Sequence, residues 1–417
     1  MVRGPVARRR IGSLWRLLLA DWGVAGVRRI TAGQRRAALV RRHRLSGAAA
    51  GPREVVAALV ALHATDPASV YLSALARSTG SAIADVYGVM YEQRALVRWM
   101  AMRRTLFVFA RDDIPMIQAA VSTPLAAALR RQLLGRIGRN GISPQAPEDL
   151  TGWLAAAEGR IEKTLDRRGS ATGTELRNEE PALRSMIPPG TRSETAQGLT
   201  SPLLTVMSTE GRLVRGTPVG GWTTRGHRWE PVAAWWPDGL PVLDPSQART
   251  ALARRWLERF GPATAEDLQW WTGWSKTTTR SALARLQLEE VDLHGRPGIN
   301  LVGDELPPPE EPVAVLLPCL DPTPMGWRYR DWFTAIDPAL IYDTAGNIGL
   351  TIWWGGELIG SWASTSSGIR TKIVADKGQE AAAAVERAAA GLHDRLGGTT
   401  VTPAVRTPLE RRLSQGK

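Results

Sequence analysis

Apolar residues recur at helical spacing near the start of the chain. Val55, Val56, Leu59 and Val60 are three and four residues apart, which places them on one face of a helix that Pro67 is expected to end. The same spacing predicts helices around 31–40, 70–76 and 86–97, followed by a strand at 102–109. Three helices closed by a strand is the pattern of a winged helix, which many other small α+β units share.

A short motif occurs twice further along. Residues 169–176 and 261–268 both read G-x-A-T-x-x-(acid)-L, and each copy stands between two helical stretches. The glycine is suited to end the first helix and the threonine to cap the second, with the acidic residue near the second helix's positive end. The motif therefore predicts the turn of a helix-turn-helix.

The residues after each copy complete the picture. After the first, an apolar helix at 203–207 leads into a strand and a glycine-rich turn that resembles a wing. After the second, residues 275–286 predict a recognition helix whose basic positions are Lys276, Arg280 and Arg285. Two copies, with a third unit implied near the N-terminus, favour a tandem array that binds DNA. The alternative is that the units only pack on one another.

The period of the apolar pattern changes after residues 303–312, a proline-rich linker by composition. Apolar residues then alternate or form short runs, and Gly355-Gly356 predicts a hairpin turn between two of them. A single alanine-rich helix is expected at 379–396. The predicted fold class is α+β, with tandem winged-helix units before a β-rich domain. The expected divisions are a basic arm (1–29), three winged-helix units (30–145, 146–240 and 241–305) and the β-rich domain with its late helix and basic tail (306–417).

Charge points to a polyanionic partner. The 417 residues include 53 basic and 40 acidic side chains, a formal charge of +13. An excess of this size favours nucleic acid, since each phosphate contact releases condensed counterions. A surface that is merely basic is the alternative. The expected partner is double-stranded DNA, bound by a monomer.

Cysteine and histidine usage argues against a metal. Cys319 is the single cysteine, so neither a disulfide nor a cysteine zinc cluster can form within the chain. The five histidines lack ligand spacing, and no apolar run reaches the length of a membrane span. The sequence therefore predicts no metal and no membrane contact. Because it has neither a phosphate loop nor a dinucleotide fingerprint, it also predicts no nucleotide cofactor.

The N-terminal residues 1–44 contain twelve arginines and one acidic residue. Arg8-Arg9-Arg10 before an apolar stretch resembles a twin-arginine export signal, but Arg16 and Asp21 interrupt that stretch. A flexible basic arm, or a start codon placed too early, is the favoured interpretation. The expected location is the cytoplasm, in association with the nucleoid.

Four stretches carry a resemblance to a known family: 62–67 (Leu-His-Ala-Thr-Asp-Pro), 102–106 (Met-Arg-Arg-Thr-Leu), 259–264 (Arg-Phe-Gly-Pro-Ala-Thr) with Trp270-Trp271, and 316–321 (Leu-Leu-Pro-Cys-Leu-Asp). In order and spacing the chain resembles, over roughly residues 30 to 365, the winged-helix DNA glycosylases of the AlkZ and YcaQ type. The resemblance implies three winged-helix units and a β-rich domain wrapping DNA, and cleavage of N-glycosidic bonds to alkylated bases. The family's catalytic signature is Gln-x-Gln or Gln-x-Asp, whereas here the two positions are His63 and Thr65.

The altered signature leaves two interpretations open. In a catalytic one, His63 acts as general base, Thr65 orients the attacking water and Asp66 stabilises the cationic sugar. A cationic alkylated base is already a good leaving group, so such a site can be chemically modest. In the other, Asp66 caps a helix that begins with Pro67, and His63 and Thr65 contact a phosphate or each other.

Two further groups are candidate DNA contacts. Arg103, Arg104 and Thr105 lie on the expected wing strand, where cations would meet phosphates; solvated edge-strand charges are the alternative. The segment around Trp327, Arg328 and Arg330 alternates aromatic and basic residues, as a loop that stacks on an extruded base would. A core position is the favoured alternative for Trp327.

Two functions follow. The first is a monofunctional DNA glycosylase-like enzyme that hydrolyses the N-glycosidic bond of alkylated bases. The second is a non-catalytic DNA-binding protein, a regulator or a lesion-recognition factor. No serine-hydrolase elbow, phosphate loop or dinucleotide fingerprint supports an unrelated enzyme.

Overall fold

The computed structural model describes residues 27–145, 148–191 and 194–416. Helices and strands are both abundant there, and the strands form several separate sheets. The fold is therefore of the predicted α+β class. The expected basic arm, residues 1–29, lies outside the described residues apart from its last three.

Three parts of the chain repeat one order of elements: a helix, a short strand, two helices and a β-hairpin. In each part the short strand pairs with the last strand of the hairpin. The first part contains α3 (Pro52–Leu59), β2 (Leu62–His63), α4 (Pro67–Arg77), α5 (Ile83–Tyr87) with the π-helix η1 (Gly88–Glu92), β3 (Leu96–Met100) and β4 (Leu106–Ala110). The second contains α8 (Leu150–Arg168), β5 (Ala171–Thr172), α9 (Gly173–Glu179), α10 (Thr200–Thr209), β8 (Leu213–Pro218) and β9 (His227–Pro231). The third contains α11 (Pro245–Phe260), the single bridge Ala263–Ile299, α12 (Ala265–Thr272), α13 (Lys276–Leu283), β10 (Leu288–Asp292) and β11 (Pro297–Leu301).

This order is that of a winged helix. We propose that the three parts are the first, second and third winged-helix units of a tandem array, close to the divisions expected from the sequence.

Both copies of the G-x-A-T motif fold as predicted. Gly169 ends α8 with a left-handed φ of 74°, a conformation that glycine adopts without strain. Thr172 caps α9 by accepting the N–H of Glu175, whose carboxylate accepts the N–H of Thr172. Thr264 and Asp267 form the same reciprocal pair at the start of α12.

A six-stranded sheet joins the first two units in the order β2-β4-β3-β8-β9-β5. The two hairpins meet side by side, and Arg98 of β3 is the register partner of Arg215 of β8. The first and second units therefore share one continuous sheet.

The C-terminal domain is built on an antiparallel sheet in the order β12-β13-β14-β15. Its strands and helices are β12 (Ala314–Leu317), β13 (Thr351–Trp354), β14 (Glu357–Thr365), β15 (Gly368–Ile373), α14 (Pro322–Met325), α15 (Pro338–Ile341), α16 (Gln379–Leu396) and α17 (Pro408–Ser414). The remaining elements are β1 (Arg28–Arg29), which pairs with β10, and α2 (Ala32–Arg42), η2 (Met102–Arg104), η3 (Arg111–Asp113), α6 (Ile114–Ile117), η4 (Gln118–Ser122), α7 (Thr123–Asn140), η5 (Pro181–Arg184), β6 (Met186–Ile187), β7 (Gln197–Gly198) and η6 (Val232–Ala234).

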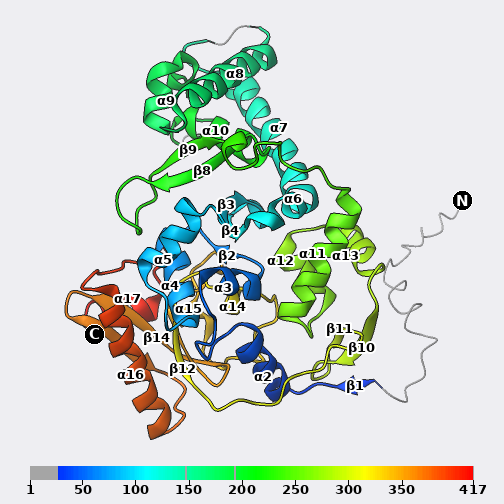
Figure 1. The fold of residues 1–417 in the computed structure, drawn as a ribbon, viewed down its shortest axis with the longest axis vertical. Coiled ribbons are helices and arrows are strands. Elements are labelled where there is room, and N and C mark those ends of the chain that lie inside the picture. Colours follow the sequence, from blue (N-terminus) through cyan, green and yellow to red (C-terminus); the bar gives the residue numbers. More distant parts are fainter. Residues whose placement is uncertain (1–26, 146–147, 192–193, 417) are drawn as a thin grey trace, which may run out of the picture.

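Figure 1 shows the second unit, in green, at the top of the molecule, at the end of the long helix α7. The third unit lies at the right and the C-terminal domain, yellow to red, mainly at the lower left. The largest apolar cluster contains Trp99 of the first unit, Trp256 of the third and Trp353 of the C-terminal domain. These parts consequently share one core, whereas much of the second unit packs around a separate cluster.

Three local predictions from the apolar pattern are wrong. The strand expected at 102–109 begins only at Leu106, because Arg103 and Arg104 form a tight turn with φ of 53° and 60°. The helix expected to reach residue 97 ends near residue 92, and 96–100 form β3. There the sequence Leu-Val-Arg-Trp-Met suits a strand paired on both sides, and that pairing overrides the helical spacing. Pro67 starts α4 in its first turn instead of ending α3.

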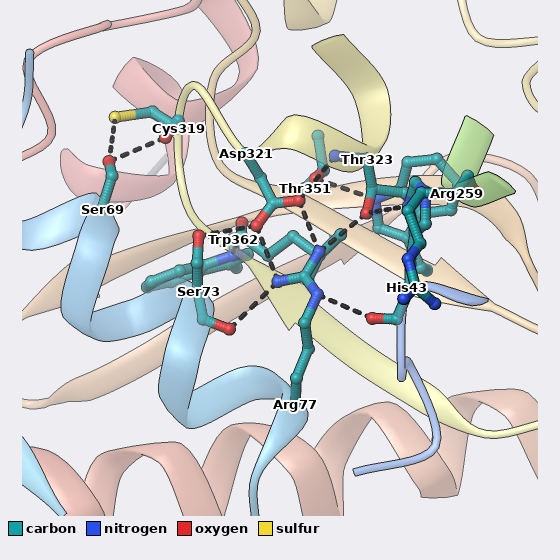
Figure 2. Close-up of polar contacts among 12 residues, drawn as sticks. His43, Ser69, Ser73, Arg77, Arg259, Cys319, Asp321, Thr323, Thr351 and Trp362 are labelled. Atoms are coloured by element: carbon teal, nitrogen blue, oxygen red, sulfur yellow. Dashed lines mark hydrogen bonds and ion pairs between the residues drawn. The ribbon is translucent and has the colours of Figure 1, made fainter. Parts of the chain in front are cut away.

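A buried ion pair links the first unit to the C-terminal domain. Arg77 at the end of α4 and Asp321 after β12 are both fully buried, with 2.6 Å between Nη2 and Oδ1. Ser73 and Arg77 both donate to Asp321 Oδ2, at 2.7 and 2.9 Å. Figure 2 shows Arg77 also reaching the carbonyl of His43 and the hydroxyl of Thr323. Every oxygen of the carboxylate thus has a hydrogen-bond donor, which offsets the cost of its burial.

Removing one partner of this pair is expected to destabilise the protein strongly. Arg77→Met leaves the Asp321 carboxylate buried without its cation, so the free energy of unfolding falls by about 3–5 kcal/mol. The shift of the urea midpoint measures the loss. The double variant Arg77→Met/Asp321→Leu recovers most of it, because no charge then remains buried. Exposed Arg387→Met is the control, and an equal loss in that variant contradicts the prediction.

Candidate active site

His63 lies on β2, the short strand of the first unit. Only 6% of its surface is exposed, and its ring centroid is 4.8 Å from that of Phe107 on β4. The N–H of Thr65 donates to His63 Nδ1 at 3.4 Å. In the neutral ring this contact puts the proton on Nε2, so Nε2 is a donor.

The electrostatic surroundings keep His63 uncharged. Burial, and after it the positive charge of Arg103, lower the pKa of His63 to about 3. The ordinary histidine pKa of ~6.5, which would suit a general base at neutral pH, does not hold here. At neutral pH the ring is a hydrogen-bonding group and only a weak base.

Thr65 and Asp66 point to different surroundings. Thr65 is exposed at the end of the short strand. Asp66 is buried, and its Oδ2 accepts from Cys319 Sγ and from the N–H of Ala404, each at 3.0 Å. Asp66 occupies the N-cap position of α4, but its side chain makes no capping hydrogen bond. Its carboxylate holds the C-terminal domain, which disagrees with the predicted role beside a cationic sugar.

Two arginines distant in sequence meet on one tryptophan. The guanidinium carbon of Arg103 lies 4.1 Å from the Trp270 ring centroid, and that of Arg330 lies 5.0 Å from it. Arg330 also lies over Tyr342 at 4.6 Å. Burial and the charge of Arg330 lower the pKa of Arg103 to about 10, so Arg103 is still a cation at neutral pH. Trp270 thus brings the predicted wing of the first unit and the predicted loop of the C-terminal domain together.

The turn that contains Arg103 and Arg104 also borders a cavity of about 380 Å³ between the first and third units. Arg103, Arg104 and Arg249 line it with Ser275 and Thr278, and no carboxylate is among the lining residues that the structure describes. Thr105 is half-buried and donates to the Met102 carbonyl at 2.8 Å, so it stabilises the turn.

The other predicted DNA contacts are divided between surface and core. Lys276 and Arg280 are exposed on α13, and Arg285 is exposed just after it, donating to Ser246 at 3.0 Å. Arg328 is exposed beside Tyr329. Trp327, however, is 2% exposed and donates to the Phe260 carbonyl at 3.1 Å. It is a core residue, as its place in a cluster of aromatic rings requires, and cannot stack on a base in this structure.

Sequence reasoning missed Trp270 and Arg249. Trp270 was noted only as half of a tryptophan pair, and a pair gives no sign of which ring is partly exposed. Its neighbour Trp271 is 4% exposed and belongs to the core. Across residues 27–145, 148–191 and 194–416 no group of three or more His, Cys, Asp or Glu side chains could hold a metal ion.

The family of the chain follows from a match that spans most of it. Residues 56–395 match the family described as DNA glycosylase AlkZ-like. The chain belongs to the AlkZ-like DNA glycosylase family. The structure is similar to that of the Streptomyces sahachiroi DNA glycosylase AlkZ, with a TM-score of 0.67 and 19% identity, over 90% of this chain and 99% of that one. No curated protein matches.

Within this family the chain keeps the overall fold over nearly its full length. A likeness at 19% identity shows the fold alone, so the AlkZ-like chemistry has to be argued from the residues present. None of the helices in the described part of the chain has both the length and the apolar composition of a membrane span.

The low pKa values of His63 and His227 predict acid sensitivity. The pKa of His63 falls to about 3 and that of His227 to about 4, mainly through burial. Between these values and the unfolded value of about 6.5, the unfolded chain binds more protons, so stability rises with pH and is complete above about 6.5. Each histidine therefore costs about 1.4 kcal/mol for every pH unit below about 6.5.

Urea unfolding at pH 7.5, 6.0 and 5.0 measures this loss. His63→Leu is expected to reduce the pH dependence by the share of one histidine. The control is His393→Leu, because the His393 ring is already exposed to water. An unchanged pH dependence in His63→Leu contradicts the assignment.

Proposed function

We propose that the protein removes alkylated bases from double-stranded DNA by hydrolysing the N-glycosidic bond. The observation that supports this most is the position of the signature residues: His63, next to exposed Thr65, lies within the electrostatic reach of Arg103. Arg103 belongs to the Trp270 stack and to a cavity whose lining contains no carboxylate. Such a surface attracts the DNA backbone next to the candidate site.

In this proposal the site residues His63 and Thr65 act by orienting the attacking water. His63 is a weak base, so it contributes a hydrogen bond that orients the attacking water, and the Thr65 hydroxyl contributes a second. The water's proton passes to solvent after the bond breaks. Such a site provides little driving force of its own, so the base must leave easily. The substrate class is therefore a cationic base, such as N7-methylguanine or N3-methyladenine.

Asp66 takes a different part. Its carboxylate is engaged by Cys319 and Ala404, so it fixes the start of α4 against the C-terminal domain. We assign it as a positioning residue for the His63–Thr65 segment.

A non-catalytic DNA-binding protein is the second candidate. The low pKa of His63 favours it, because a strong general base is missing at this position. In that case the same cationic surface binds DNA and no base is released.

Single-turnover release of free base distinguishes the two candidates. Wild type is expected to release N7-methylguanine from duplex DNA but not uracil, whose leaving group is neutral. His63→Ala should reduce the rate by about 10²-fold, as loss of a positioned group does. The rate should stay flat from pH 5.5 to 8, because His63 does not titrate there.

Restoring the family's signature gives the matched comparison. His63→Gln/Thr65→Gln is expected to release base at least as fast as wild type. Glu386→Gln, at an exposed position on α16, serves as the control for folding. Tight DNA binding by wild type, with no release of either cationic base, supports the non-catalytic candidate. Rapid release by the double glutamine variant alone locates the deficiency at these two residues.

The salt dependence of DNA affinity should arise in part from two cationic side chains, Arg104 and Lys276. Arg104→Asn keeps a residue that tolerates positive φ while removing a charge, and Lys276→Gln removes one from α13. Each cation that no longer neutralises a phosphate lowers the slope of log K against log salt by about 0.9, so the double variant lowers it by about 1.8. Fluorescence anisotropy with a labelled duplex measures the slope. Glu386→Gln on α16 is the control, and a slope unchanged in the double variant excludes a phosphate interaction at these two positions.

A further inference from the structure

One row of side chains crosses the six-stranded sheet on a single face. Register partners in antiparallel strands point to the same side of a sheet. The register pairs of this row place Arg98 and Arg215 next to each other at its centre, with apolar neighbours on both sides. From β2 to β5 the row reads Leu62, Val108, Arg98, Arg215, Trp229 and Ala171.

Both arginines are buried, and neither has an acidic partner among the described residues. Arg98 is 5% exposed and Arg215 is 6% exposed. Nη2 of Arg98 donates to the Gly216 carbonyl at 2.7 Å, and its Nε is buried with no partner. Nη1 of Arg215 donates to Ser208 at 2.8 Å, and its guanidinium carbon lies 4.6 Å from the Trp229 ring. In the part of the chain that the structure describes, neither forms an ion pair.

The carboxylate nearest in register is directed elsewhere. Glu230 is the partner of Val214, so its side chain lies on the opposite face of the sheet from Arg215. There it accepts from Trp235 at 2.9 Å and pairs with Arg94 at 3.2 Å. Two like charges side by side in a sheet, both buried, are destabilising unless a negative charge compensates them.

His227 adds a further buried nitrogen without a hydrogen-bond partner. It follows the β8–β9 turn, and its Nε2 is buried without a partner. Burial, then the charges of Arg98 and Arg215, lower its pKa to about 4. Burial, and after it the two arginine charges, therefore keep His227 neutral near neutral pH.

We propose that the seam between β3 and β8 is a binding site for a phosphate-type oxyanion, held by Arg98 and Arg215. Guanidinium forks match phosphate oxygens in pairs. A free phosphate of about −1.5 to −2 neutralises both cations, whereas a DNA phosphodiester, with one negative charge, neutralises one of them. The site differs from the candidate active site: His63 belongs to the adjacent row with Phe107 and Trp99, on the other face of the sheet. The phosphate comes either from the free ion or from a DNA strand.

Thermal unfolding with inorganic phosphate, at ionic strength held constant with chloride, tests the site. Phosphate at about ten times its half-saturating concentration is expected to raise the melting temperature of the full-length protein by on the order of 2 °C. Arg215→Met should lose this response and, without phosphate, melt no lower than wild type, because a buried charge has been removed. Arg215→Lys keeps the charge but loses the fork, so its response should be weakened. Exposed Arg254→Met is the control and keeps the full response.

A second measurement does not depend on variants that fold. Equilibrium dialysis of wild type against labelled phosphate is expected to show one saturable equivalent. A response equal to that of chloride, or no saturable binding, overturns the proposal, as does an unchanged response in Arg215→Met.

Competition identifies the source of the phosphate. If the anion is a DNA phosphate, inorganic phosphate weakens duplex binding by wild type beyond the effect of ionic strength, and Arg98→Met/Arg215→Met loses that effect. If the free ion is the ligand, duplex binding is unaffected. Both outcomes require the phosphate site. If the site does not exist, base release is unaffected, because His63 lies on the other face of the sheet.

Discussion

The buried pair between Arg77 and Asp321 is the constraint on which the rest of the molecule depends. It joins two positions 244 residues apart, the end of α4 and the segment after β12, in a place that water does not reach. Because α4 begins directly after Asp66, fixing this helix also fixes the segment that carries His63 and Thr65. Cys319 reinforces the link, since Sγ donates to Asp66 and its carbonyl accepts from Ser69 at 2.7 Å. The candidate site is thus positioned by the C-terminal domain as much as by its own unit.

The same arrangement separates two kinds of polar residue in the family motifs. Asp66 and Asp321 are conspicuous in the sequence, yet both carboxylates are buried and occupied by hydrogen bonds within the protein. The groups left facing outward are Thr65 and the cations around Trp270. A site composed in this way attracts a polyanion and holds a neutral imidazole next to it. Under the proposed function, this composition suits substrates that are already activated, because His63 is only a weak base.

The sequence predicted what depends on local interactions. The α+β class and the two capped G-x-A-T turns follow from which residues suit helix ends, and Thr172 and Thr264 cap as expected. The apolar pattern could not show that Arg103 and Arg330 share Trp270, or that Arg98 lies beside Arg215. Periodicity tells which side of an element is buried, but not which distant element covers it. Burial also determines the protonation of His63. The residue type alone gives the pKa of a side chain in water, and that value does not apply to a buried ring.

The shared sheet has a consequence for the newly synthesised chain. Arg98 on β3 and Gly216 within β8 are 118 residues apart, so β3 leaves the ribosome long before its neighbour exists. At roughly 5–20 residues per second the delay is about 6–24 s, during which β3 is an uncovered edge strand. A buried arginine in the middle of that strand makes it a poor template for pairing with other chains, since its charge would enter any sheet that formed there. Arg98, whose buried charge is costly in the folded protein, therefore hinders mispairing of β3 before β8 has been made.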